Sequence, residues 1–456
     1  MHEQVINIIK DQKLTYAQQL LALARYAENL DTTLVLSDEL IQAKKDGVLC
    51  DLGEGAAPYR PRYIIPDYQK LIDNGSTFLQ LDPPQDLWEA CNSLMIMYRH
   101  VPSITSFPVY LGGLDELLEP FVVKMDKDEA KKCLRLFLLN IDRTLTDSFV
   151  HANIGPKASL TGELLLELTQ EMNCAIPNLT LKYDPTITSD DFAQKAVVCM
   201  LKVAKPSFAN HQMFVKEWSE RYAVASCYNG LTIGGGGFTL PRLRLFECAT
   251  KANSIQEFMD KTLPYYVDLQ LKEMDDRIRF LVEESNFFKS NFLVKEGFVN
   301  LDNFTGMFGM VGLAEGVNQL LNIQDPALGY GHNEQANKLA ITILDKIDRL
   351  VKAHNSPYAK NFDHKYRLHA QVGIDSDGRQ DSPGVRCPIG FEPEMIDQIV
   401  LAQSTHPYFP TGVGDIFKVE ETWLKTPDSL LDIIKGALNG GMRYFSGYCA
   451  NNDVVE

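Results

Sequence analysis

Cys227 is the residue whose surroundings in the sequence most suggest chemistry. It follows the apolar run 222–225 and lies among serine, asparagine and glycine, which favour turns. A second short apolar stretch follows, and then four consecutive glycines at 234–237. The pattern predicts a buried strand, a tight loop with Cys227 at its tip, and a returning strand. The glycines indicate close backbone approach or φ angles that other residues resist.

A cysteine in such a loop could serve in three ways. It could be a buried structural thiol, because cysteine is among the most buried residue types. It could be a thiolate nucleophile, which needs a base or a positive field nearby, and His211 lies upstream. It could form a thiyl radical that takes a hydrogen atom from a substrate, which requires a dry, enclosed cavity instead of a base. The local residues leave all three open.

Other residues could contact a substrate. His151 and Asn153 lie in a predicted loop that ends in Gly155-Pro156, and His151 could be a general acid or a packing residue. Glu315 lies in a predicted helix, and the glycines before that helix could cradle an anion or allow tight packing. No Gly-Lys-Ser/Thr follows these glycines, so they do not form a P-loop.

Two further features are weaker candidates. Cys387, next to a proline at the end of a polar loop, is a second possible reactive thiol. Arg60 and Arg62 lie in a stretch rich in glycine, proline and tyrosine. That stretch is either a surface loop fixed by its prolines or the rim of an active site with two anion contacts.

Composition narrows the class of protein. The chain has 456 residues, of which 45% are hydrophobic and 23% charged, as is ordinary for a globular protein. A net charge of -16 argues against binding to nucleic acid or to an anionic membrane. No apolar stretch is long enough to span a bilayer, and the N-terminus lacks signal-peptide features.

The nine cysteines include no CxxC pair, which favours a cytoplasmic protein with reduced thiols and no bound metal or iron–sulfur cluster of its own.

The elements that would position these residues alternate between helices and short apolar strands, which favours an α/β fold. We expect helices at 160–172 and 333–352, and strands at 178–183, 293–299 and 442–449. Segment 304–321 should run from a loop into a helix. The whole chain, 1–456, is expected to be a single domain with an N-terminal helical part up to about residue 150.

Four segments resemble glycyl radical enzymes, and most closely their YjjI-type subfamily. They are His151-Ala152-Asn153-Ile154-Gly155-Pro156, Val224-Ala225-Ser226-Cys227-Tyr228-Asn229, Leu293-Val294-Lys295-Glu296-Gly297 and Met307-Phe308-Gly309-Met310-Val311-Gly312-Leu313-Ala314-Glu315. The last is similar to a segment of anaerobic ribonucleotide reductases. The resemblance implies a ten-stranded barrel of two half-barrels surrounded by helices, with Cys227 as the thiyl residue on a central finger loop.

The same resemblance implies partners and contacts. The radical would be installed by a separate activase that uses S-adenosylmethionine and an iron–sulfur cluster, and the chain itself would bind no cofactor. His151, Asn153, Asn229 and Glu315 would contact a small-molecule substrate, and the protein could be a homodimer. Ser226 stands where formate-lyase-type enzymes have a second cysteine, and Asn229 where diol dehydratases have an acid. The substrate therefore stays open.

The sequence departs from the family at its C-terminal end. Such enzymes carry the radical on a glycine in an Arg-Val-x-Gly-Tyr-like motif, and residues 451–456 are similar to the stretch that leads into it. The expectation is a chain that is truncated just before its radical glycine, so that another polypeptide supplies the glycine or the chain is inactive. Gly447 follows Arg443 with one residue too many for the motif, and we interpret its surroundings as a strand and turn.

The first hypothesis is therefore a glycyl radical enzyme that abstracts hydrogen from a small substrate through Cys227. The alternative is a catalytically dead barrel that acts as a binding or scaffold protein. A third possibility is a hydrolase or transferase in which Cys227 acts as a nucleophile with a histidine.

Overall fold

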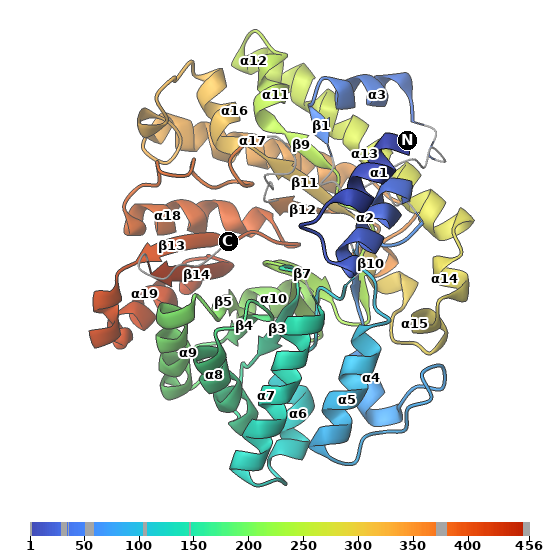
Figure 1. Cartoon of the computed structure of the whole chain (residues 1–456). Coiled ribbons are helices and arrows are strands. Elements are labelled where there is room, and N and C mark those ends of the chain that lie inside the picture. Colours follow the sequence, from blue (N-terminus) through green and yellow to red (C-terminus); the bar gives the residue numbers. More distant parts are fainter. Residues whose placement is uncertain are drawn as a thin grey trace.

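A two-stranded antiparallel hairpin lies near the middle of the molecule, between larger sheets with helices around them (Figure 1). The computed structural model describes residues 2–28, 34, 36–50, 59–103, 107–145, 147–370 and 381–449. The hairpin consists of β6 (Tyr222–Ala225) and β7 (Asn229–Thr232). The predicted strand, loop and return around Cys227 are thereby confirmed.

A five-stranded sheet lies on one side of the hairpin, in the order β13-β14-β5-β4-β3. Its neighbours run parallel except for the antiparallel pair β14 and β5. The strands are β3 (His151–Ile154), β4 (Asn178–Tyr183), β5 (Ser207–Asn210), β13 (Asp415–Val419) and β14 (Tyr444–Cys449).

A four-stranded sheet lies on the other side, in the order β1-β9-β11-β12. Strands β9, β11 and β12 are parallel, and β1 is antiparallel to β9. The strands are β1 (Leu49–Cys50), β9 (Arg242–Arg244), β11 (Met307–Val311) and β12 (Arg367–Ala370).

The glycine run forms the middle of a third sheet, where β8 (Gly235–Gly237) lies between β10 (Phe304–Thr305) and β2 (Tyr63–Ile65). A Cβ atom on Gly235 would lie 2.0 Å from the carbonyl oxygen of Asn303. One on Gly236, whose φ is +157°, would lie 2.0 Å from the carbonyl oxygen of Tyr63. Close backbone approach is therefore the reason for these glycines.

Helices surround these sheets (Figure 1). Local signals set the starts of two of them, since Ser159 and Ser189 accept backbone N–H bonds as the N-caps of α8 (Leu160–Met172) and α9 (Asp190–Val203). Before β3 come α1 (His2–Lys10), α2 (Tyr16–Glu28), α3 (Asp38–Lys45), α4 (Tyr68–Asn74), α5 (Leu87–Tyr98), α6 (Leu114–Val122) and α7 (Lys127–Thr144). After it come α8 (Leu160–Met172), α9 (Asp190–Val203), α10 (His211–Trp218), α11 (Leu245–Thr250), α12 (Ile255–Glu257), α13 (Leu263–Arg279), α14 (Phe287–Ser290), α15 (Phe292–Lys295), α16 (Leu313–Leu320), α17 (Glu334–Ala353), α18 (Met395–Thr405) and α19 (Pro427–Asn439).

Shorter turns complete the described chain. Two π-helical turns, η1 (Phe258–Thr262) and η2 (Phe280–Glu284), flank α13, and 3-10 turns occur at η3 (Leu301–Asn303), η4 (Pro326–Leu328), η5 (Lys360–Phe362), η7 (His406–Tyr408) and η8 (Glu421–Lys425). In the part of the chain that the structure describes, no helix has both the length and the apolar character needed to cross a bilayer.

The α/β class is confirmed, whereas the described strands fall into sheets of five, four, three and two and do not form one continuous ten-stranded sheet. Three local predictions were wrong. The predicted loop at His151 and Asn153 is strand β3, and the predicted strand at 293–299 begins as the helical turn α15. The predicted loop before α16 contains β10 and β11. A short apolar run does not by itself distinguish a strand from a helical turn or a loop, since partners distant in sequence decide which one forms.

Candidate active site

Cys227 lies at the tip of the hairpin formed by β6 and β7. Ala225 pairs with Asn229 at the end of the ladder, and the three residues between them form the tip. Ser226 adopts the left-handed conformation there, with φ of +61°, which turns the chain sharply. Of residues 222–231, Cys227 alone is not buried. Cys227 is thus the one partly exposed residue between Tyr222 and Leu231.

The outer edge of β6 is satisfied by groups from outside the hairpin. The Asn153 side chain donates to the Val224 carbonyl at 2.8 Å and accepts from the Val224 N–H at 2.9 Å. The Lys182 ammonium donates to the Tyr222 carbonyl at 2.8 Å and lies 4.3 Å from the centre of the Tyr222 ring. At the tip, Ser226 donates its N–H to the Val109 carbonyl at 3.0 Å. A buried strand edge needs such partners, because each unpaired backbone group would cost free energy.

Tyr228 anchors the other side of the tip. Its hydroxyl donates to the Ala370 carbonyl at 2.9 Å, and its ring stacks on His369 with centroids 6.0 Å apart. The ring of Tyr444 meets it edge-on, with centroids 5.9 Å apart. Gly414 fits beside both tyrosines, where a Cβ atom would lie 2.8 Å from each ring. The position of Cys227 is therefore fixed by its neighbour on each side.

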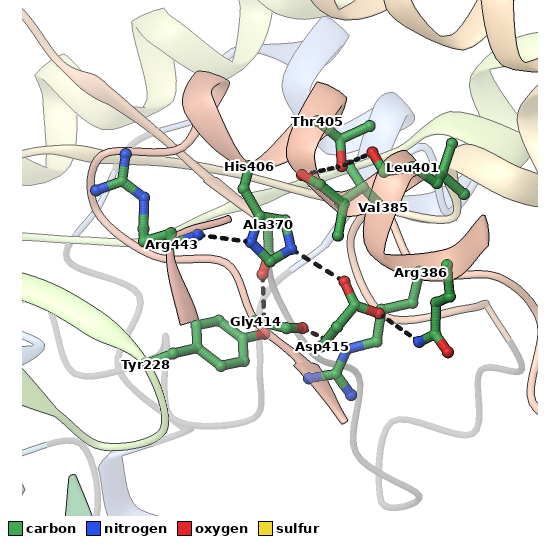
Figure 2. A network of polar contacts seen from close by, with 12 residues as sticks. Tyr228, Ala370, Val385, Arg386, Leu401, Thr405, His406, Gly414, Asp415 and Arg443 are labelled. Carbon is green, nitrogen blue, oxygen red and sulfur yellow. Dashed lines mark hydrogen bonds and ion pairs between the residues drawn. The ribbon is translucent and has the colours of Figure 1, made fainter. Parts of the chain in front are cut away.

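A polar network lies behind Tyr228 (Figure 2). His406, fully buried, accepts from the Arg443 N–H at its Nδ1 atom, 3.1 Å away. Its Nε2 atom therefore carries the proton and donates to Asp415 at 3.0 Å. Gln398 donates to the other oxygen of Asp415 at 3.0 Å. In the same network, the Nε atom of Arg386 donates to the Gly414 carbonyl at 2.6 Å.

The surroundings of Cys227 favour the protonated thiol. Burial raises the pKa of Cys227 above its ordinary value, and the nearby charge of Arg386 offsets part of that rise. His211 bonds through its Nδ1 atom to the Tyr222 hydroxyl at 3.0 Å. Among the described residues, no histidine forms a hydrogen bond with Cys227.

The structure places two of the predicted contacts at the hairpin. Asn153 is fully buried with both amide atoms bonded to Val224, so it positions the hairpin instead of facing a substrate. Asn229 begins β7 two residues after Cys227 and is buried. His151 lies two residues before Asn153 and thus on the same face of β3. Burial lowers the pKa of His151 to about 3, so its ring is neutral.

Other candidates lie elsewhere. Glu315 accepts from the N–H and hydroxyl of Ser382, and burial raises its pKa. Cys387 is buried, and burial raises its pKa to about 12, which makes it an unreactive thiol. Gly447 lies within β14, paired with Phe417 on β13, so it is part of a sheet and not of a loop.

The arginines near residue 60 do not form an anion site. Arg60 forms an ion pair with Glu28 at 3.4 Å, and Arg62 is buried with its guanidinium over the ring of Tyr63. The glycine-rich stretch at 51–58 and the C-terminal stretch at 451–456 lie outside the described residues. Within the described residues, no group of three or more histidine, cysteine, aspartate or glutamate side chains could hold a metal ion.

Sequence reasoning missed Lys182 and Arg386. A lysine in the apolar strand 178–183 was an available signal, since a lysine there must be paired or placed at an edge. Arg386 offered no such signal, because only the fold brings it to Tyr228.

Comparisons with known proteins identify the family of this chain. A family model described as "Glycyl radical enzyme YjjI-like" matches residues 14–456. A protein of Haemophilus influenzae is 42% identical over 459 residues, covering all of this chain and 89% of the relative. YjjI of Escherichia coli is 40% identical over 435 residues, covering 95% of this chain and 84% of the relative.

Solved structures share the fold at low sequence identity. The anaerobic ribonucleotide reductase of Thermotoga maritima, with citrate in its active site, superposes with a TM-score of 0.72 at 12% identity, covering 98% of this chain and 92% of that one. The glycerol-bound B12-independent glycerol dehydratase of Clostridium butyricum gives a TM-score of 0.61 at 12% identity, covering 94% of this chain and 71% of that one. The family model and the two relatives establish that this chain belongs to the YjjI-like family of glycyl radical enzymes.

Proposed function

We propose that Cys227 is the residue that abstracts a hydrogen atom from a carbon of a small-molecule substrate. The observation that carries this proposal is the hairpin that is buried from Tyr222 to Leu231 except at Cys227. A radical on sulfur must be shielded from solvent and from other side chains, yet open to one substrate. A hairpin tip with one partly exposed cysteine between buried neighbours supports both requirements.

The protonation state of Cys227 supports the same chemistry. Hydrogen-atom transfer starts from an intact S–H bond, whereas nucleophilic attack starts from a thiolate. Burial raises the pKa of the thiol, and the ring of His211 is bonded to Tyr222 instead. These two features favour the radical role over the nucleophilic one.

The steps balance as single hydrogen-atom transfers. Cys227 gives its S–H hydrogen atom to a glycyl radical, which becomes an ordinary glycine. The resulting thiyl takes a hydrogen atom from a substrate carbon and leaves a carbon radical, and the product radical later takes the hydrogen atom back. In this family a radical S-adenosylmethionine activase installs the glycyl radical. We propose that the glycine comes from an Arg-Val-x-Gly-Tyr-like segment, in this or another polypeptide.

Exchange with heavy water tests the role of Cys227. The protein is incubated anaerobically with the activase and a polypeptide that carries the glycine motif, and electron paramagnetic resonance should show a doublet. The S–H proton exchanges with solvent, so in D₂O reversible transfer should place deuterium on the glycine and collapse the doublet to a singlet. Cys227→Ser should form the doublet and keep it in D₂O.

Two variants serve as controls. Cys387→Ser should behave as the wild type, because that buried thiol contacts the Tyr330 carbonyl and not the hairpin tip. Gly447→Ala should keep the radical signal, because Gly447 lies within a strand. Collapse of the doublet in Cys227→Ser would contradict the proposed role. A wild-type protein that forms no radical with an active activase would favour the alternative of a binding protein.

A further inference from the structure

We propose that Arg386 binds an oxyanion of the substrate, a carboxylate or a phosphoryl group, beside Cys227. This inference rests on the proposed role of Cys227, because it assigns the chemical class of the molecule that this site accepts. Arg386 lies next to the hairpin tip, is held there by contacts on one side of its guanidinium, and forms no ion pair among the described residues.

Arg386 is held in place through one side of its guanidinium. Its Nε atom donates to the Gly414 carbonyl at 2.6 Å, and its Cζ atom lies 5.8 Å from the centre of the Tyr228 ring (Figure 2). Tyr228 directly follows Cys227, and both Arg386 and Cys227 are partly exposed. The guanidinium group of Arg386 is thus held near Cys227 in the absence of a ligand.

The two terminal nitrogens of Arg386 remain available. Among the described residues, neither forms a hydrogen bond or an ion pair. Two other arginines of the interior are paired with carboxylates, and one of them, Arg443, donates to both oxygens of Glu217, at 2.5 and 2.8 Å. Arg244 donates to both oxygens of Asp381, at 2.5 and 3.2 Å. The free pair of N–H donors on Arg386 matches the two oxygens of a carboxylate or phosphoryl group.

Asp415 is the carboxylate close to Arg386 in this network, and the two charges act on each other without a hydrogen bond between the side chains. Both oxygens of Asp415 are already bonded, one to His406 and one to Gln398. Arg386 thus keeps two N–H donors that Asp415 does not occupy. The charge of Arg386 also acts on the thiol of Cys227, whose pKa it lowers against the effect of burial.

Alkylation with a matched pair of reagents tests this inference without any radical. Iodoacetate and iodoacetamide both react with the thiolate of Cys227, forming an S–C bond and releasing iodide, but only iodoacetate is an anion. Because both rates depend equally on the thiol pKa, their ratio isolates the attraction of the anion. Mass spectrometry of the Cys227 peptide gives both rates, and glutathione gives the reference ratio.

The expected iodoacetate-to-iodoacetamide ratio at Cys227 exceeds that of glutathione by about tenfold, since a nearby cation in a partly dehydrated site attracts the anion. Arg386→Gln should lower the ratio to the glutathione value, and Arg386→Lys should give an intermediate ratio. Arg221→Gln is the matched control: Arg221 precedes the hairpin, its side chain is 61% exposed and pairs with Asp67, and its loss should leave the ratio unchanged.

The wild type alone can overturn the inference, even if an Arg386 variant fails to fold. A wild-type ratio no higher than that of glutathione does so without any variant. If Arg386→Gln folds, a ratio in that variant equal to the wild-type ratio also overturns the inference. Malonate and inorganic phosphate are tested as protectants of Cys227 against alkylation, with potassium chloride at equal ionic strength as the reference. The anion that slows alkylation of Cys227 identifies the class of oxyanion. Protection by neither beyond that of chloride also overturns the inference. None of these results bears on whether Cys227 forms a radical, which the D₂O experiment decides separately.

Discussion

The side chain of Asn153 pairs with the backbone of Val224 as a neighbouring strand would. Its amide nitrogen and oxygen bond to the Val224 carbonyl and N–H at 2.8 and 2.9 Å, and both residues are fully buried. One residue of β3 thereby connects the five-stranded sheet to the hairpin that carries Cys227. Asparagine suits this position because its amide offers one donor and one acceptor.

We expect Asn153→Ala to destabilise the protein by about 3 kcal/mol, because it leaves a buried N–H and a buried carbonyl of Val224 without partners. Urea unfolding measures the loss, and the alkylation rate of Cys227 should rise as the hairpin loosens. Asn178→Ala is the control. Asn178 on β4 is half-buried and donates one hydrogen bond to the Ser148 carbonyl, so its loss should cost much less. Equal losses of stability in Asn153→Ala and Asn178→Ala would contradict the role of Asn153 in holding the hairpin.

Lys182 predicts a specific dependence of stability on pH. Burial lowers its pKa from 10.5 to about 8. Between these pH values the unfolded chain holds the proton on Lys182 and the folded chain does not, so the contribution of Lys182 to stability rises with pH by about 3 kcal/mol. Lys182→Met has no group to titrate and should lack this gain. The measurement is the free energy of unfolding at pH 8 and pH 10.5 for both proteins.

Lys195→Met is the control for this effect. Lys195 lies on α9 and pairs with Glu163 and Asp191 at 2.9 and 2.7 Å, which raises its pKa. Its ammonium therefore stays protonated through this window in the folded protein, and the variant should keep the wild-type gain. If Lys182→Met also keeps that gain, the low pKa of Lys182 is wrong.

Local patterns in the sequence are enough to predict many of the elements. The helix at 160–172 and the strand at 178–183 have the bounds of α8 and β4. These elements depend on nearby residues: Ser159 caps the helix, and the strand is a short apolar run. The hairpin was predictable for the same reason, because its two apolar runs flank a turn-forming tip.

The contacts that define the site could not be predicted from the sequence. Asn153 and Val224 are 71 positions apart, and nothing in either neighbourhood indicates the other. His151 and Asn153 were interpreted as loop residues because β3 is only four residues long and its neighbour β4 comes after a whole helix. Arg386 reaches Tyr228 only after two distant segments have folded together.

The pH dependence of alkylation distinguishes a thiol from a preformed thiolate at Cys227. Burial raises its pKa, so the rate with iodoacetamide should keep rising at pH values where N-acetylcysteine has levelled off. Arg386→Gln should move the midpoint to still higher pH, because it removes a charge that lowers this pKa. A midpoint below that of N-acetylcysteine would instead indicate a nucleophile.

Gly414 predicts that added volume beside the hairpin tip will disturb the site. A methyl group there would lie 2.8 Å from the rings of both Tyr228 and Tyr444, so Gly414→Ala should cost about 1–3 kcal/mol. The displaced Tyr228 should weaken its bond to Ala370 and carry Cys227 with it, which should raise the alkylation rate of that thiol. Urea unfolding and alkylation are measured on the same preparations.

Gly436→Ala is the matched control for Gly414→Ala, because Gly436 lies inside α19 and a Cβ atom there would meet nothing within 4 Å. This change should stabilise the protein by about 0.5–1 kcal/mol, since alanine is the better helix former. It should leave the alkylation of Cys227 unchanged. If Gly414→Ala is as harmless as Gly436→Ala, the tyrosines beside the tip can move without strain. The sulfur would then be held from the side of β6 and Ser226, through Asn153, Lys182 and the Val109 carbonyl.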